Sequence, residues 1–286
     1  MPPAFPSLNS GRVITYAQAR HDEYGNEISL LPLLTNSTGI THVIVAAIHL
    51  NEGPGNIHLN DDPPEHPKYK QLWGEVRWLQ GAGIGVLGML GGAAKGSYER
   101  LAGDDASFEA YYLPLKRLIT RYSLSGLDLD IEEAVPLSCP LRLIHRLRSD
   151  FGPTFLITLA PVATALLPSL PHLSGFSYFE LHRLAGHEIA WYNTQFYCGW
   201  ADASKPDTYD AIVAAGWPAE KVVLGVVTNA ENGAGYVEHE GLADVVRVLR
   251  ARYPRFGGVM GWEYFNAMPG QRAAPWEWAR TGEGGR

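Results

Sequence analysis

Four acidic residues stand close together in the run from Ser125 to Glu133, which reads SGLDLDIEE. Successive side chains of a β-strand point to opposite faces, so Asp128, Asp130 and Glu132 would share one face of a strand. Neighbouring members of this acidic set would lie about 6–7 Å apart. Because burial and nearby like charge both favour a protonated carboxyl group, we expect at least one of the three pKa values to be raised. A carboxyl group of this kind is suited to general acid catalysis near neutral pH.

The elements around the acidic run follow an alternating pattern. Short apolar runs alternate with helical patterns along the chain, which is typical of a parallel α/β fold. The expected strands are residues 13–16, 42–50, 85–90, 126–131, 155–160, 189–197, 222–227 and 258–262. The expected helices include residues 68–80, 105–122, 141–151, 206–215 and 242–252. Eight strands in 286 residues predict a (β/α)8 TIM barrel, which takes about 250 residues, with the acids on its fourth strand.

The sequence shows no internal repeat or linker, so we expect one domain over residues 1–286 with its barrel core at about residues 11–266. Residues 270–286 are polar and Gly-rich and are expected to form a loose tail. Trp276 and Trp278 could anchor part of that tail.

Composition excludes several kinds of partner. A net charge of -7 provides no basic surface for nucleic acid, and no apolar run is long enough to cross a membrane. Cys139 and Cys198 are too few for a disulfide framework and lack metal-ligand spacing, so we expect neither a metal nor a cofactor. Residues 1–10 do not resemble a secretory signal. We therefore expect a cytoplasmic monomer, or a secreted protein if a leader has been removed.

The acidic run resembles the signature of glycoside hydrolase family 18, Asp-Gly-x-Asp-x-Asp-x-Glu, matched from Gly126 to Glu132. Ser125 stands where the family has its first Asp, a change that affects proton-relay tuning more than catalysis. Four further features over residues 11–266 are similar to the family: Tyr16 near the end of strand one, the run 89–92 with Met89 replacing a Ser before Gly91 and Gly92, the run Gln195-Phe196-Tyr197 on strand six, and Trp262 on the last strand.

This resemblance implies a retaining reaction in which the 2-acetamido oxygen of the substrate attacks its own anomeric carbon. Glu132 would protonate the leaving oxygen and then activate water. Asp130 would orient the acetamido N–H and stabilise the oxazolinium ion, and Asp128 would share a proton with Asp130. The other implied contacts are a hydroxyl from Tyr197 to the acetamido oxygen, a floor of Trp262 beneath the sugar, and substrate binding by Tyr16, Gly91, Gly92 and Gln195.

Three further positions carry expectations from their place in the predicted strands and loops. Glu263 and Asn266 follow the last strand, where loops of a barrel meet the site, and are expected to bind substrate. Glu133 should point away from the acidic face and form a structural ion pair.

The substrate is less constrained than the reaction. Residues 191–200 and 261–266 resemble fungal endo-β-N-acetylglucosaminidases, which cut the N,N'-diacetylchitobiose core of N-glycans. We therefore expect an N-glycan substrate first and a chitin oligosaccharide as the alternative. A lectin-like member that binds glycan or chitin without turnover is the alternative of another class.

Overall fold

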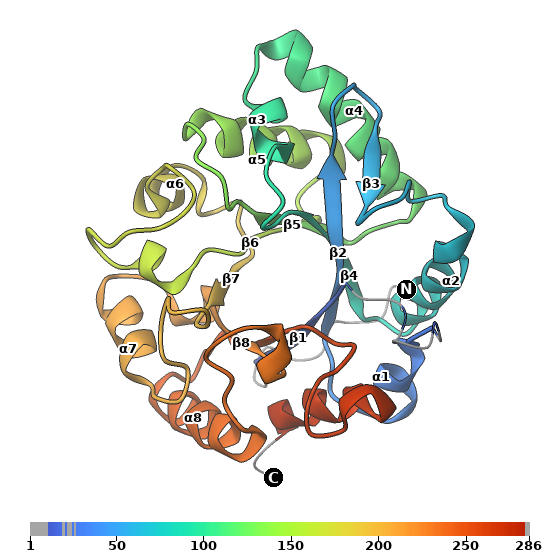
Figure 1. The fold of residues 1–286 in the computed structure, drawn as a ribbon. Helices are drawn as coiled ribbons and strands as arrows, with labels where there is room; N and C mark the ends of the chain where they lie inside the picture. The colour runs from blue at the N-terminus through green and yellow to red at the C-terminus, as the bar shows by residue number, and fades with distance from the viewer. Residues whose placement is uncertain (1–10, 19–20, 22–24, 26, 284–286) are drawn as a thin grey trace.

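Eight parallel strands close into a barrel in this computed structural model, which describes residues 11–283 except 19–20, 22–24 and 26. Figure 1 looks along the barrel, with the helices arranged around it. The (β/α)8 barrel is therefore confirmed. Its strands are β1 (Arg12–Ala17), β2 (His42–Leu50), β4 (Gly85–Gly91), β5 (Gly126–Asp130), β6 (Leu156–Leu159), β7 (Trp191–Gln195), β8 (Val222–Val227) and β9 (Gly258–Trp262).

The barrel strands lie where the apolar runs predicted them. β2, β8 and β9 have the expected bounds, and β1 pairs with both β2 and β9 to close the ring. Strand β7 is shorter than expected, because the chain leaves the sheet after Gln195. Strand β5 ends at Asp130, so Glu132 lies in the loop just beyond the strand.

In the described part of the chain, eight α-helices surround the barrel: α1 (Leu31–Thr35), α2 (Lys70–Gly81), α3 (Ser97–Leu101), α4 (Asp105–Arg121), α5 (Ser138–Phe151), α6 (Tyr178–Ala185), α7 (Asp207–Ala214) and α8 (His239–Arg252). The sequence predicted five of them. Helices α1 and α3 have 5 residues each, too few for a clear helical period. Helix α6 has 8 residues and was not predicted, although α7 has the same length. The short strand β3 (Ile57–Leu59), which pairs antiparallel with β2, was also not predicted.

Two apolar layers fix which way the acids of β5 point. Leu127, Leu129 and Ile131 belong to the large layer between strands and helices. Met89 and Trp191 belong to a smaller cluster inside the barrel. Because side chains of a strand alternate, Asp128 and Asp130 point into the barrel.

The expectation of a loose tail was wrong for residues 275–283. They form the 3-10 helix η7 (Pro275–Glu283), which packs against α8 and β1. Trp278 is buried, and its indole fills the space beside Gly261, where an added Cβ would lie 2.7 Å from the ring. Residues 1–10 and 284–286 lie outside the described residues. In the part of the chain that is described, no helix combines the length and the apolar character that a membrane span requires.

Candidate active site

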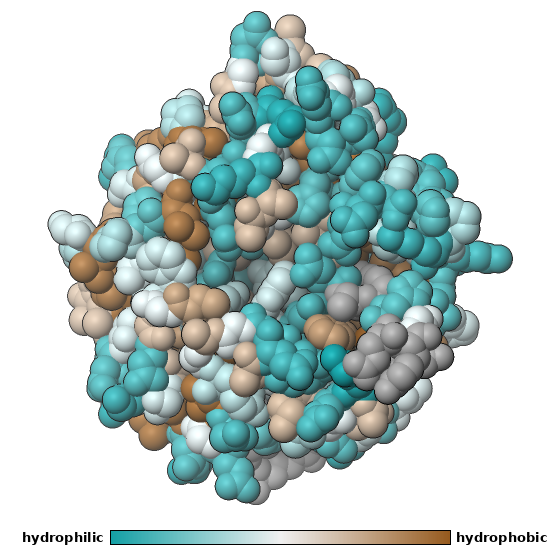
Figure 2. Space-filling view, viewed as in Figure 1, coloured by the Kyte–Doolittle hydropathy of each residue, from teal (hydrophilic) through white to brown (hydrophobic). Residues whose placement is uncertain are grey.

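A cavity of about 430 Å³ opens at the carboxyl ends of the barrel strands. In the space-filling view, hydrophilic side chains gather around the hollow at the centre of this face (Figure 2). We call it the carboxylate cavity. Its lining includes Gln18, His49, Met89, Gly91, Gly92, Asp130, Glu132, Leu173, Gln195, Tyr197, Cys198, Trp200, Asn232 and Trp262. The structure therefore brings together Asp130, Glu132 and Tyr197, which the sequence places on two distant strands.

Asp128 lies beneath the cavity, with no solvent-exposed surface. One carboxylate oxygen accepts hydrogen bonds from the Thr158 hydroxyl at 2.5 Å and from the Asn193 amide at 2.9 Å. The other accepts a hydrogen bond from the Tyr16 hydroxyl at 2.6 Å. Burial raises the pKa of Asp128, and these three donors oppose the rise because they stabilise the charged form.

Asp130 has less support for a charge. The Gln195 side chain donates to its Oδ1 at 3.2 Å. Burial, then the charge of Glu132, then that of Asp128 hold the pKa of Asp130 well above its usual range. Asp130 therefore retains a proton more readily than Asp128.

The glycine pair of β4 allows the chain to pass close to Asp130. An added Cβ at Gly91 would lie 2.3 Å from the Asp130 carbonyl oxygen, and both Gly91 and Gly92 have positive φ. The Gly92 N–H donates to that carbonyl at 2.9 Å. Any other residue would be strained in this conformation, so the pair shapes the cavity wall beside Asp130.

Glu132 is half-buried at the cavity wall, and Gln195 links it to Asp130. The Gln195 side-chain nitrogen lies 3.4 Å from a carboxylate oxygen of Glu132 and donates to the Ala160 carbonyl at 2.9 Å. The same nitrogen contacts Asp130. Both carboxyl groups therefore lie on one side of the cavity.

Tyr197 presents its hydroxyl as a hydrogen-bond donor. The residue lines the cavity but is largely buried. Burial, followed by the charges of Asp130 and Glu132, holds the pKa of its hydroxyl well above the usual range. The group therefore stays protonated at every pH at which the protein would work.

Tyr16 lies near the end of β1, as predicted. Its ring lies 5.4 Å from that of Trp262, which lines the cavity, but Tyr16 itself does not. Because the Tyr16 hydroxyl donates to Asp128, Tyr16 supports that carboxylate, and its predicted contact with substrate stays a prediction.

Glu263 and Asn266 were also predicted to contact substrate, and neither lines the cavity. The Glu263 carboxylate accepts the backbone N–H of Gln18 at 2.9 Å. Asn266 exchanges side-chain hydrogen bonds with Asn232 at 2.9 Å. Gln18 and Asn232 do line the cavity, so Glu263 and Asn266 hold its wall from behind.

The prediction of an ion pair at Glu133 was wrong for the described residues. Its carboxylate accepts backbone N–H groups of Gly96 at 3.0 Å and Tyr98 at 2.8 Å, at the start of α3. A carboxylate at this end of a helix satisfies N–H groups that have no partner within the helix. Glu133 thus fixes α3, and its neighbour Glu132 faces the cavity.

Sequence reasoning missed Thr158 and Asn193, which bind Asp128 from β6 and β7. Thr158 is the one polar residue of an otherwise apolar strand, and that contrast was an available signal; Asn193 stands among the polar residues of β7 and offers no such contrast. Met89 lies beside Asp128 in the pairing of β4 and β5 and has no hydrogen to donate. Ser125 lies just before β5, where its hydroxyl accepts the Val86 N–H at 3.4 Å, so its departure from the family signature lies outside the cavity.

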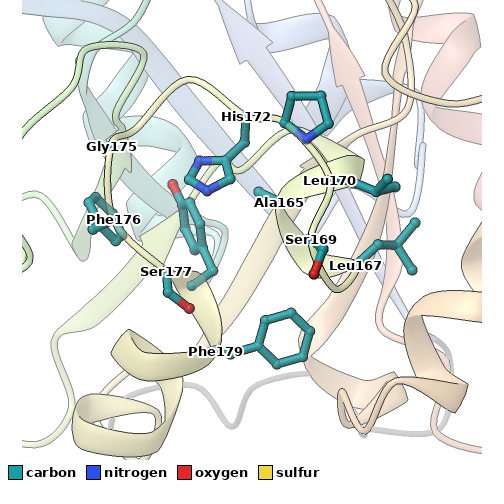
Figure 3. A pocket seen from close by; sticks show the side chains of 11 residues that line it. Ala165, Leu167, Ser169, Leu170, His172, Gly175, Phe176, Ser177 and Phe179 are labelled. Carbon is teal, nitrogen blue, oxygen red and sulfur yellow. The ribbon is translucent and has the colours of Figure 1, made fainter.

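Two of the other hollows on the molecule contrast with the carboxylate cavity. One, of about 730 Å³, shares Gln18, His49 and Ala94 with the carboxylate cavity. We call it the histidine cavity; its other lining residues are His21, Asn51, His58, Asn60, Asp61, Lys68 and Tyr69. Figure 3 shows the other, where Leu167, Leu170, Phe176 and Phe179 surround His172 between the β6 loop and α6. This apolar hollow has no carboxyl group in its lining.

The described residues contain no set of three or more His, Cys, Asp or Glu placed to hold a metal ion. The chemistry that this site offers from its own side chains is proton transfer, hydrogen bonding and stabilisation of positive charge.

Comparison with solved structures identifies the family. The fold matches a fungal endo-β-N-acetylglucosaminidase from glycosyl hydrolase family 18 with 47% identity over 95% of this chain and 96% of that one, at a TM-score of 0.90. This chain belongs to glycoside hydrolase family 18. The glycoside hydrolase is also similar to the chitinase ChiC from Aspergillus fumigatus, with 53% identity over 94% of this chain and 97% of that chain and a TM-score of 0.89.

A family 18 chitinase from Cycas revoluta in complex with (GlcNAc)3 shares the fold at 18% identity, a TM-score of 0.68, and coverage of 94% of this chain and 98% of that one. No protein-family model and no curated protein sequence matched this glycoside hydrolase.

The adjacent glutamates allow a matched test of the assignment. We predict that Glu132→Gln lowers kcat by about 10²–10⁴-fold, the usual contribution of a general acid–base group, without lowering the thermal midpoint. Glu133→Gln should instead lower the free energy of unfolding by about 1–3 kcal/mol, because it weakens charged hydrogen bonds to buried N–H groups, and should keep turnover. Turnover by Glu132→Gln at the wild-type rate would contradict the assignment.

The raised pKa of Asp130 predicts how stability depends on pH. Between the ordinary Asp pKa of about 3.9 and the raised value, the folded protein holds a proton that the unfolded chain has lost. The free energy of unfolding therefore falls as pH rises through this window, by at most about 1.4 kcal/mol per pH unit. We predict that Asp130→Asn, which has no such proton to lose, gains stability relative to wild type between pH 4 and pH 7 in chemical denaturation. Parallel curves for the two proteins would contradict the raised pKa.

Proposed function

We propose that this glycoside hydrolase is an endo-β-N-acetylglucosaminidase that hydrolyses the β-1,4 bond of the N,N'-diacetylchitobiose core of N-glycans by a retaining, substrate-assisted mechanism. The observation that carries the proposal is the position of the two carboxyl groups in the cavity. Asp130 and Glu132 contact the same Gln195 nitrogen, at 3.2 and 3.4 Å, and so stand on one side of the cavity.

This arrangement disfavours the common two-carboxylate mechanisms. They require an acid and a nucleophile or base on the two sides of the scissile bond, whereas Asp130 and Glu132 both contact one nitrogen of Gln195. Asp128 is sealed beneath the cavity by Tyr16, Thr158 and Asn193 and cannot reach an anomeric carbon. We therefore assign the role of nucleophile to the 2-acetamido oxygen of the substrate. Asp130 and Glu132 are then left to assist that oxygen and the leaving group.

The steps follow from the positions of the donors and acceptors. Burial and the charges of Glu132 and Asp128 favour a proton on Asp130 in the free protein. With substrate bound, the proton resides on Glu132, which gives it to the leaving oxygen while the acetamido oxygen bonds to the anomeric carbon. The Asp130 carboxylate accepts the acetamido N–H, and the Tyr197 hydroxyl donates to the acetamido oxygen. Glu132 then takes a proton from water, which opens the oxazolinium ion.

The histidine cavity supports an N-glycan as the substrate. It adjoins the carboxylate cavity through Gln18 and His49, and its described lining is mostly polar or charged. Tyr69, the one phenol or indole side chain in that described lining, is buried and not available for stacking. Hydrogen-bonding groups suit the hydroxyl-rich branches of a glycan, whereas sugar faces are recognised by exposed aromatic rings. The likeness to a fungal endo-β-N-acetylglucosaminidase supports the same substrate.

A chitinase is the second candidate, and one observation favours it. The chain shares 53% identity with a chitinase from Aspergillus fumigatus, and the two adjoining cavities could hold a linear oligosaccharide. In either case the bond that is cut joins two N-acetylglucosamine units. The cytoplasmic location and the monomeric state stay predictions.

The two substrates can be compared directly. We predict that the protein, incubated with a high-mannose glycoprotein and separately with chitin oligomers, releases glycan from the glycoprotein and leaves one N-acetylglucosamine on Asn, as read by mass spectrometry. Cleavage of the chitin oligomers alone would reverse the order of the two candidates. Binding of either sugar without turnover would support the lectin-like alternative.

The role of Asp130 can be separated from that of Glu132. We predict that Asp130→Asn slows hydrolysis of the glycan, because formation of the oxazolinium ion loses its carboxylate, but still hydrolyses a supplied sugar oxazoline at a measurable rate. Glu132→Gln serves as the matched variant and should slow both reactions. Equal losses of both activities in Asp130→Asn would count against substrate assistance.

A further inference from the structure

Trp191 of β7 lies inside the barrel below the carboxyl groups and does not line the carboxylate cavity. Its indole N–H donates to the side-chain oxygen of Asn193 at 2.9 Å. The side-chain nitrogen of Asn193 in turn donates to Asp128 at 2.9 Å. All three residues are almost completely buried. They form a hydrogen-bonded path from the barrel interior to the lowest carboxyl group.

The direction of this path is fixed by the chemistry of the indole. An indole N–H can only donate, whereas an amide presents an oxygen at one end and an NH₂ group at the other. The Asn193 oxygen must therefore face Trp191, and its NH₂ group must face Asp128. The other donors to Asp128 are the hydroxyls of Tyr16 and Thr158, which can rotate and either donate or accept. Asn193 is the partner that can only donate.

We infer that Trp191, acting through Asn193, is a positioning residue that holds Asp128 as the ionised carboxylate of the site. The inference rests on the proposed function in one respect: it leaves the proton that moves during hydrolysis to Asp130 and Glu132. The oxygen of Asp128 that faces the fixed NH₂ group cannot carry a proton without placing two hydrogens against each other, so a proton could enter only at the other oxygen, where the Tyr16 hydroxyl would have to turn from donor to acceptor.

Two contacts hold the Trp191 ring in the orientation that this role requires. The Arg12 guanidinium lies 4.5 Å from the ring centre, and the His42 ring meets it edge-on at 4.8 Å. Burial lowers the pKa of Arg12 to about 10 and that of His42 to about 3. Near neutral pH the first stays charged and the second stays neutral, so neither changes charge while the enzyme works.

The groups around Asp128 leave few that can titrate with it. Asp130 is its acidic neighbour on β5, and Met89 of β4 is uncharged. Burial and the nearby carboxylates hold the pKa values of the tyrosines that influence it well above the usual range, those of Tyr16, Tyr98 and Tyr197, and burial also raises that of Tyr178. A change in proton binding at this site therefore reports on the carboxyl groups.

The test compares two buried tryptophans. Trp191→Phe keeps the ring volume but removes the N–H, so the Asn193 amide is free to turn its oxygen toward Asp128. Trp217→Phe is the matched control, because the buried Trp217 N–H has no hydrogen-bond partner among the described residues. Carboxyl ¹³C NMR of the full-length protein would follow the titration of Asp128 in both variants and in wild type.

We expect the titration midpoint of Asp128 to rise by about one pH unit in Trp191→Phe, the loss expected for one charged hydrogen bond, and to stay unchanged in Trp217→Phe. The acid limb of kcat/KM against pH should shift in the same direction by a similar amount. An Asp128 midpoint in Trp191→Phe equal to that of wild type would overturn the inference.

A second variant separates the path from general packing, and serves if Trp191→Phe does not fold. Asn193→Leu should raise the Asp128 midpoint by itself, and adding Trp191→Phe to it should raise the midpoint no further, because Trp191 acts only through Asn193. Additive shifts, or no shift in Asn193→Leu, would overturn the inference. If the wild-type protein hydrolyses neither N-glycan nor chitin oligomers, the proposed function fails, whereas the NMR titration needs no turnover and still decides the role of Trp191.

Discussion

Removing carboxyl groups from water inside a closed barrel is the constraint on which this active site depends. An ionised carboxylate moved into a protein interior loses several kcal/mol of hydration unless hydrogen bonds replace it. The two most buried acids of the barrel differ in the hydrogen-bond donors and charges around them. Asp128 has three donors, whereas Asp130 has a single amide and a charged neighbour on either side. One acid can therefore hold a charge, and the other is driven to hold a proton.

The barrel topology makes this unequal treatment possible. Parallel strands bring inward-facing residues of different strands to similar heights, so β1, β6 and β7 each direct a donor at Asp128. The glycine pair at the end of β4 lets that strand pass close to the Asp130 carbonyl. Gln195 lies two residues after Asn193 on the same face of β7. Its side-chain amide contacts both Asp130 and Glu132. The carboxyl groups thus differ in proton affinity because each meets a different layer of the same barrel.

The sequence predicted the barrel because buried strands are almost continuously apolar and the acids alternate with leucines. The bounds of β2, β8 and β9 followed from that contrast. Short elements such as α3 and β3 escaped because they contain too few residues to show a period. The tail was misjudged because its many polar and Gly residues outweighed Trp278, whose indole fills the space beside Gly261.

Residues of the site that belong to a recognisable motif were predicted from the sequence. Residues whose role depends on which strand lies beside them were not. Asp130, Glu132 and Tyr197 were found from their own runs. The roles of Tyr16, Glu263 and Asn266 depend on which residue of a neighbouring strand or loop stands opposite. A single sequence does not contain that register, so it did not show that these residues also hold other parts of the site in place. Thr158 and Asn193 were overlooked for the same reason.

In the proposed mechanism two displacements follow one another at the anomeric carbon, and Glu132 serves first as acid and then as base. Two successive displacements at one carbon restore its original configuration. ¹H NMR of the newly formed reducing end, recorded before the anomers equilibrate, tests this most directly. The account predicts the β-anomer as the first product, and initial formation of the α-anomer would contradict it.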